Sequence, residues 1–193
     1  MDPCMFAIVK TLPNGQVQRA WMLAHVDDCD IAGENDALLQ EILEVCKSIW
    51  TIEVVSSDFM LGIRRRITRG SDDKVATVKL DMIPFVEGTV EAFRTHLPTK
   101  EVKEPVPKGF TTSKMDVISD EEIKAVLDAG FQTGVGMVLW AVRHVFPECR
   151  VGCSLVCRLM AKPSWSVFNG LMQIIKWMDQ NKCVGLTYTG GVN

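Results

Sequence analysis

Two adjacent carboxylates, Asp27 and Asp28, lie between two short apolar runs at 23–26 and 31–33. An apolar run, an acidic pair and a second apolar run predict a β-hairpin with carboxylates at its tip. Because like charges repel, such a pair is usually tolerated when it binds a hard cation such as Mg²⁺. The alternative is a plain polar turn, in which Asp is favoured for turn chemistry. Taken alone, the motif favours this alternative.

Composition limits the classes of protein that the chain can belong to. With 193 residues it can form one domain or two small ones, and its 47% hydrophobic side chains argue against global disorder. The formal net charge of -3 argues against a strongly basic nucleic-acid binder. We expect no membrane span, because no apolar run approaches about 20 residues. Seven cysteines without a secretion signal predict reduced thiols and an intracellular protein.

The front half of the sequence predicts strands and one helix. Strands are expected at 4–9, 17–24 and 29–32, with an Asn14-Gly15 turn between the first two. Asn35 or Asp36 can cap a helix whose apolar stripe runs to Ile49 and covers the sheet. Further strands are expected at 51–55, 59–68 and 75–80. Because the chain begins within a strand, we expect further sequence upstream.

The back half predicts mainly helices. A helix is expected at 83–93, followed by a segment rich in Pro, Lys and Glu. Further helices are expected at 119–127, 131–146, 151–160 and 163–179, and a final strand at 184–188. The fold class is therefore α+β. The predicted organisation is an antiparallel sheet covered by helices over 1–96, a linker over 97–118, and a helical region over 119–193.

Two clusters of side chains have competing interpretations. Arg64, Arg65, Arg66 and Arg69 concentrate positive charge on one predicted hairpin, which would attract a phosphate backbone. Alternatively, these charges protect an exposed edge strand from pairing with another chain. The cluster taken alone favours this alternative. The second cluster, with a spacing of four, consists of Cys149, Cys153 and Cys157. These thiolates could bind Zn²⁺ with His144, but zinc sites usually contain closely spaced ligand pairs, so we expect core cysteines.

The order of motifs resembles the C-terminal part of the reverse transcriptase of copia-type retrotransposons. The N-terminal matches are Asp2-Pro3-Cys4-Met5-Phe6, His25-Val26-Asp27-Asp28, Ile31-Ala32-Gly33 and Phe59-Met60-Leu61-Gly62-Ile63. The C-terminal matches are Val135-Gly136, Leu139-Trp140-Ala141, Arg143, Pro147, Ser154-Leu155, Arg158, Met160, Pro163 and Gly185-Leu186-Thr187-Tyr188. His25 replaces the family's tyrosine, Asp30 adds a third carboxylate, and the family's Arg-Pro-Asp motif is absent.

The resemblance implies a palm-like sheet, then a thumb and connection region that ends in the first strand of an RNase H domain. It implies RNA-directed DNA polymerisation with Mg²⁺ or Mn²⁺, in which Asp27 and Asp28 are the catalytic and metal-binding residues. Phe59, Met60, Leu61, Gly62 and Ile63 would form a primer grip. The implied partners are an RNA/DNA template–primer hybrid and a deoxynucleoside triphosphate, in the cytoplasm or a virus-like particle. From their charge, we expect Arg64, Arg65 and Arg66 to bind the hybrid's phosphates.

The resemblance places the family's first catalytic aspartate and its fingers upstream of Met1, and the RNase H domain downstream. We therefore expect the chain to be inactive alone, with weak Mg²⁺ binding. One alternative is a non-catalytic domain that binds nucleic acid or protein. Another is an unrelated Mg²⁺-dependent phosphotransferase that uses Asp27, Asp28 and Asp30.

Overall fold

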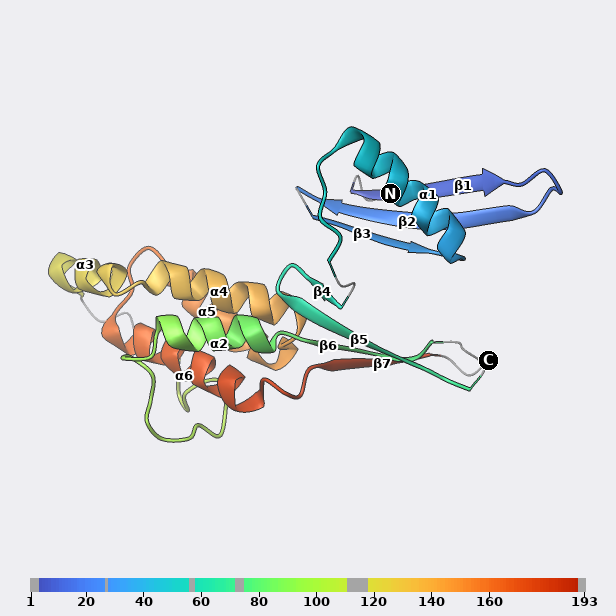
Figure 1. Cartoon of the computed structure of the whole chain (residues 1–193). Coiled ribbons are helices and arrows are strands. Elements are labelled where there is room, and N and C mark those ends of the chain that lie inside the picture. The colour runs from blue at the N-terminus through green and yellow to red at the C-terminus, as the bar shows by residue number, and fades with distance from the viewer. Residues whose placement is uncertain (1–3, 27, 56–57, 72–74, 111–117, 191–193) are drawn as a thin grey trace. The chain divides into compact units, whose positions relative to one another are not determined.

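The computed structural model describes residues 4–26, 28–55, 58–71, 75–110 and 118–190. It contains helices and antiparallel strands in both halves of the chain, which confirms the α+β class (Figure 1). The chain divides into two compact units, residues 1–61 and residues 62–193. Each unit is described separately below.

The first unit is a three-stranded antiparallel sheet with one helix. The sheet has the order β1-β2-β3, and α1 packs on β2 and β3. Its elements are β1 (Met5–Thr11), β2 (Val17–His25), β3 (Asp28–Gly33) and α1 (Asp36–Ile49). Gly15 has a φ of 81° in the turn between β1 and β2, where the sequence predicts a hairpin. The carboxamide oxygen of Asn35 accepts a hydrogen bond from the N–H of Leu38 at 2.8 Å, which confirms the predicted cap.

Burial in the first unit follows the alternation of strand side chains. Ala20 and Leu38 are buried between the sheet and α1. Residues paired across β1 and β2 share a face, so the odd-numbered residues of these strands lie on the face opposite Ala20. The large apolar side chains on that face are exposed: Met5, Val9, Val17, Trp21 and Leu23. The core of this unit is therefore thin and one-sided.

Two predicted strands differ from the structure. Residues 51–55, all of them described, form no strand, and Val54 and Val55 are exposed. Strand propensity reflects packing on a sheet, and these β-branched residues lack that packing. The predicted strand over 59–68 is two strands, β4 (Phe59–Met60) and β5 (Ile63–Arg69). Leu61 and Gly62 separate them, with φ values of 52° and 80°, as in the type I′ turns of tight hairpins.

The second sheet has the order β4-β5-β6-β7, and the pairs β5–β6 and β6–β7 are antiparallel. The remaining strands are β6 (Val75–Asp81) and β7 (Leu186–Thr189). The strand predicted near the C-terminal end is thus present, and it pairs with β6 within the second unit.

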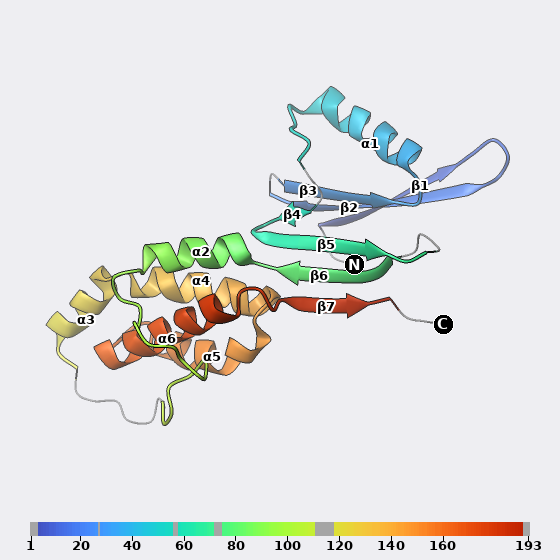
Figure 2. The same cartoon turned by 60° about the horizontal axis from the view of Figure 1, so that its bottom comes forward.

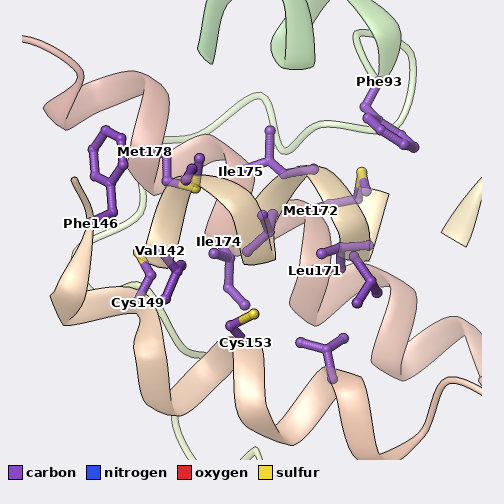
Figure 3. Close-up of a cluster of buried hydrophobic side chains, with 14 of the residues drawn as sticks. Phe93, Val142, Phe146, Cys149, Cys153, Leu171, Met172, Ile174, Ile175 and Met178 are labelled. Carbon is purple, nitrogen blue, oxygen red and sulfur yellow. The ribbon is translucent and has the colours of Figure 1, made fainter. Parts of the chain in front are cut away.

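The helices of the second unit form its core (Figure 2). They are α2 (Ile83–Ala92), α3 (Asp120–Asp128), α4 (Phe131–His144), the 3₁₀ helix η1 (Pro147–Cys149), α5 (Arg150–Arg158) and α6 (Trp165–Asn181). Helix α6 contributes the largest buried set, which Figure 3 shows facing Val142, Cys149 and Cys153. Within the described residues, no single helix is long and apolar enough to span a bilayer, although α3 and α4 together, bent by 56°, pass that test.

Residues 97–110 of the segment predicted as a linker over 97–118 pack on the helical unit, and most of its remainder lies outside the described residues. The N–H of Val102 donates to the side-chain oxygen of Gln180 at 3.0 Å, and the side-chain nitrogen of Gln180 donates back to the Val102 carbonyl. Phe110 lies so close to Gly170 that a Cβ there would be 2.7 Å from its ring. The structure therefore divides the chain at residues 61 and 62 rather than over 97–118. Proline-rich composition indicates an irregular segment, but not a detached one.

We expect Leu171→Ala to lower the free energy of unfolding of the second unit by about 2–5 kcal/mol, because it leaves a cavity in a fully buried site. Chemical denaturation followed by circular dichroism measures this change. Leu139→Ala, at a side chain that is 41% exposed on α4, is the matched control and should cost far less. Equal losses in the two variants would contradict the position of the core.

Candidate functional site

The predicted acidic hairpin is formed by β2 and β3. His25 and Asp28 are the last paired residues at its tip, and Val26 follows His25 with a φ of 57° and 96% exposure. Asp28 is the exposed first residue of β3. Asp27, the predicted direct metal ligand, lies outside the described residues.

The side chains near this tip suit a hard cation in the kind of donor that they offer. Asp28 and Asp30 are two residues apart on β3, so they share a face of the sheet. Their carboxylate oxygens are the donors that Mg²⁺ prefers. In the described part of the chain, however, no group of three or more His, Cys, Asp or Glu side chains is placed to hold a metal ion. The described residues therefore offer the kind of donor that Mg²⁺ prefers, but they do not form a complete set of ligands.

The residues predicted as a primer grip form the tight hairpin between β4 and β5. Phe59 is 47% exposed, and the turn residues Leu61 and Gly62 connect it to Ile63 at the start of β5. The arginines follow immediately on β5. The predicted primer-grip residues and the predicted phosphate-binding residues are therefore consecutive parts of one hairpin.

Arg64 and Arg66 both bind the carboxylate of Asp81, the last residue of β6. The Nε of Arg64 donates to the two carboxylate oxygens at 3.0 and 3.2 Å, and its Nη2 donates to Oδ2 at 3.2 Å. The Nη2 of Arg66 donates to Oδ2 at 2.7 Å. Asp81 is fully buried, whereas the side chains of Arg64 and Arg66 are 35% and 54% exposed. One buried carboxylate thus holds two partly exposed guanidinium groups.

The protonation of Asp81 follows from these contacts. Burial opposes ionisation, but the hydrogen bonds from Arg66 and Arg64, and a weaker one from the backbone N–H of Ile83, outweigh it. The pKa of the Asp81 carboxyl therefore lies below its ordinary value. Asp81 is charged at neutral pH, and so are its two arginine partners.

One face of the second sheet is polar over residues 64–68 of β5 and the residues paired with them on β6 and β7. Cross-strand pairs share a face, so the register of these strands gathers the polar residues together. We call this surface the Arg–Thr face; it consists of Arg64, Arg66, Thr68, Thr77, Lys79, Asp81, Thr187 and Thr189. It carries three cationic side chains and one carboxylate. Arg65 lies on the opposite face, with Ile67 beside it and Leu80 across the strand pair, so the predicted trio is divided.

The cysteines at 149, 153 and 157 belong to the helical core or its edge. Cys149 and Cys153 are buried, and the sulfur of Cys157 lies 4.0 Å from that of Cys153. Burial is the main cause that raises the pKa of both Cys149 and Cys153 to about 12, with smaller effects from neighbouring acidic groups. Both are therefore protonated thiols that pack as small apolar groups, as the sequence predicts.

Sequence reasoning missed Asp81, Lys79 and the threonines of the Arg–Thr face. The sequence signal that could have found them is the period-two alternation of strands. It puts Arg64 and Arg66 on one face of their strand, and Lys79 and Asp81 on one face of theirs. Joining these pairs requires the register of the β5–β6 hairpin. That register shifts between Thr68 and Arg69, and alternation in the sequence does not reveal the shift.

Comparison with known proteins adds no relative to this description. The chain matches no family model, and no curated protein or solved structure is significantly similar to it. Functional inference therefore depends on the motifs and on the geometry of the two hairpins.

Asp81→Asn should lower the free energy of unfolding of the second unit by about 1–3 kcal/mol at neutral pH, because the two arginines lose the negative charge and one of the two acceptor oxygens of their partner. In the native chain the ionised carboxylate stabilises the fold above the unfolded-state pKa, and this contribution is lost as pH falls through the lowered native pKa. The difference between the two proteins should therefore shrink below about pH 4.

Denaturation curves measured across this pH range test the effect of Asp81. The matched control is Asp128→Asn, which removes an exposed ion pair with Lys124 on α3. This control should leave stability at neutral pH nearly unchanged. A stability difference for Asp81→Asn that is the same at every pH would contradict the role of the ionised carboxylate.

Proposed function

We propose that the chain is part of an RNA-directed DNA polymerase of the copia type. Support comes from the order of two features: an acidic tip on the β2–β3 hairpin, then a tight β4–β5 hairpin that leads into the Arg–Thr face. The first feature lies on a sheet that α1 covers on one side only. The observation that carries the proposal is the hairpin closed by His25 and Asp28, in which the second aspartate of the Asp27-Asp28 motif begins β3.

In this proposal each group of residues has a distinct task. Asp27 and Asp28 hold Mg²⁺ or Mn²⁺, which when bound supplies charge stabilisation for nucleotidyl transfer. Phe59 to Ile63 contact the primer strand, and Arg64 and Arg66 bind phosphates of the template–primer hybrid. We expect the 193-residue chain to bind nucleic acid rather than to polymerise by itself. The family's first catalytic aspartate is not among the motifs that the chain matches.

A second candidate is a nucleic-acid-binding domain without catalysis. The Arg–Thr face favours it, since arginine, lysine and threonine side chains are common donors to phosphate oxygens. This candidate requires no metal at the acidic hairpin. Because both candidates bind nucleic acid, metal binding at the acidic hairpin distinguishes the two functions.

We expect weak Mg²⁺ binding by the chain, and weaker binding by Asp27→Asn, because the substitution removes a carboxylate ligand. Isothermal titration of Mg²⁺ into the two proteins measures the difference. Asp36→Asn, at an exposed position in the first turn of α1, is the matched control and should bind as the native chain does. Identical titrations for the native chain and Asp27→Asn would remove Asp27 as a ligand and leave the non-catalytic function.

We expect an RNA/DNA hybrid to bind the chain with strong salt dependence. The double variant Arg64→Gln/Arg66→Gln should lose affinity, and its slope of log K against log salt should fall by roughly 0.9 for each phosphate that the protein no longer neutralises. Fluorescence anisotropy across a salt series measures both effects. The control, Arg143→Gln/Arg158→Gln, removes the same charge from exposed positions on α4 and α5. Equal losses in the two double variants would mean that net charge, and not the Arg–Thr face, determines binding.

A further inference from the structure

We propose that Asp81 is a positioning residue, which orients Arg64 and Arg66 so that their outward donors bind consecutive oxygens along a nucleic-acid phosphate backbone. This inference rests on the proposed nucleic-acid-binding role of the Arg–Thr face. It assigns a function to a residue that touches no ligand itself. Three features of the structure carry it: the donor geometry, the depth of the carboxylate, and the attachment of Asp81 to the core.

The bonds to Asp81 occupy only part of each guanidinium. A guanidinium has about five N–H donors, and the bonds to Asp81 use fewer than half of those on Arg64 and Arg66. The two arginines are separated by one residue on β5, so their side chains emerge from the same face about 6.6 Å apart. Two flexible side chains are thus fixed as a pair before any ligand arrives, which reduces the entropy lost on binding.

The depth of the carboxylate determines which charge an approaching ligand meets. Asp81 is fully buried, whereas Arg64 and Arg66 remain partly exposed in front of it. An anion therefore reaches the guanidinium groups without direct contact with the carboxylate. Arg64, Arg66 and Asp81 together retain one net positive charge, and Lys79, across from Arg66, adds another.

The position of Asp81 is fixed by the core of the second unit. It ends β6 and immediately precedes Met82, which is fully buried in the hydrophobic core. Its Oδ1 also accepts a hydrogen bond from the N–H of Ile83, at 3.4 Å, in the first turn of α2. Helix α2 packs on α4 and α6, so the carboxylate belongs to a rigid element rather than to a loop. Rigid support of this kind keeps a binding group within the narrow range of useful geometries.

The class of ligand follows from the donors around the arginine pair. Threonine side chains continue the Arg–Thr face along β5 at Thr68 and on β7 at Thr187, and both are exposed. Arginine with threonine hydroxyls is a common combination at phosphate and sugar oxygens of nucleic acids. Over residues 64–68 of β5, and at the residues of β6 and β7 paired with this stretch, the face carries no apolar side chain. These observations favour a nucleic-acid backbone over an acidic protein partner.

The test uses Asp81→Asn in the full chain, because the effects of charge and of positioning have opposite signs. Removing the carboxylate adds one positive charge to the face, so charge alone predicts tighter binding of an RNA/DNA hybrid. Loss of positioning predicts binding that is weaker by roughly two- to tenfold, with a smaller salt slope. The variant is measured at a temperature at which its circular dichroism equals that of the native chain. Equal or tighter binding would overturn the inference while leaving the Arg–Thr face as the binding surface.

A second variant applies if Asp81→Asn does not fold. Arg64→Lys keeps the positive charge on a partly exposed residue but loses the bond from Nε to Asp81. We expect weaker hybrid binding than in Arg143→Lys, a matched exchange on α4. Unchanged binding would overturn the inference.

Two further results of the same binding assay separate the inference from the proposed function. If the native chain does not bind the hybrid, the proposed function fails, and the inference fails with it. If polyglutamate competes with the hybrid as well as a second nucleic acid does, the face recognises anions in general, and the nucleic-acid assignment is overturned.

Discussion

The buried carboxylate of Asp81 links three elements of the second unit. It ends β6, binds β5 through Arg64 and Arg66, and accepts a hydrogen bond from the backbone of Ile83 in α2. A buried charge is costly unless it is paired, so these contacts must form together. The register of the β5–β6 hairpin and the start of α2 are consequently parts of one arrangement. Asp81 therefore joins the polar face of the sheet to the helical core.

The two units differ in how much apolar surface they bury. The second unit has a continuous core that includes Phe131, Phe168 and Ile175, whereas Ala20 and Leu38 are the buried apolar residues of the described part of the first unit. Apolar burial is the main favourable term in folding, so most of the stability belongs to the second unit. The acidic hairpin therefore depends on backbone pairing and on one covering helix. The proposed metal site therefore lies on the weakly packed first unit, and the proposed phosphate site lies on the well-packed second unit.

Local signals in the sequence predicted most helices and turns well. The features that were missed depend on which strands pair with one another. Asn14-Gly15, Asn35 and Ser119 marked a turn and two helix starts correctly, because each acts through its immediate neighbours. The run 51–55 was predicted as a strand from propensity, which cannot show whether a partner strand is present. The same limit applied to the site: the arginines were visible as a cluster, but Asp81 becomes their partner only through the hairpin register.

Val26, at the tip of the acidic hairpin, has a backbone conformation that is unfavourable for its residue type. A β-branched residue rarely adopts a φ of 57°, and asparagine or glycine would do so at lower cost. Nor does burial compensate, because the side chain is 96% exposed. The backbone next to Asp27 is thus held in a conformation that its own sequence disfavours by about 1–3 kcal/mol. The paired strands β2 and β3 hold Val26 in this conformation, so a change in its backbone angles would alter the start of β3 at Asp28.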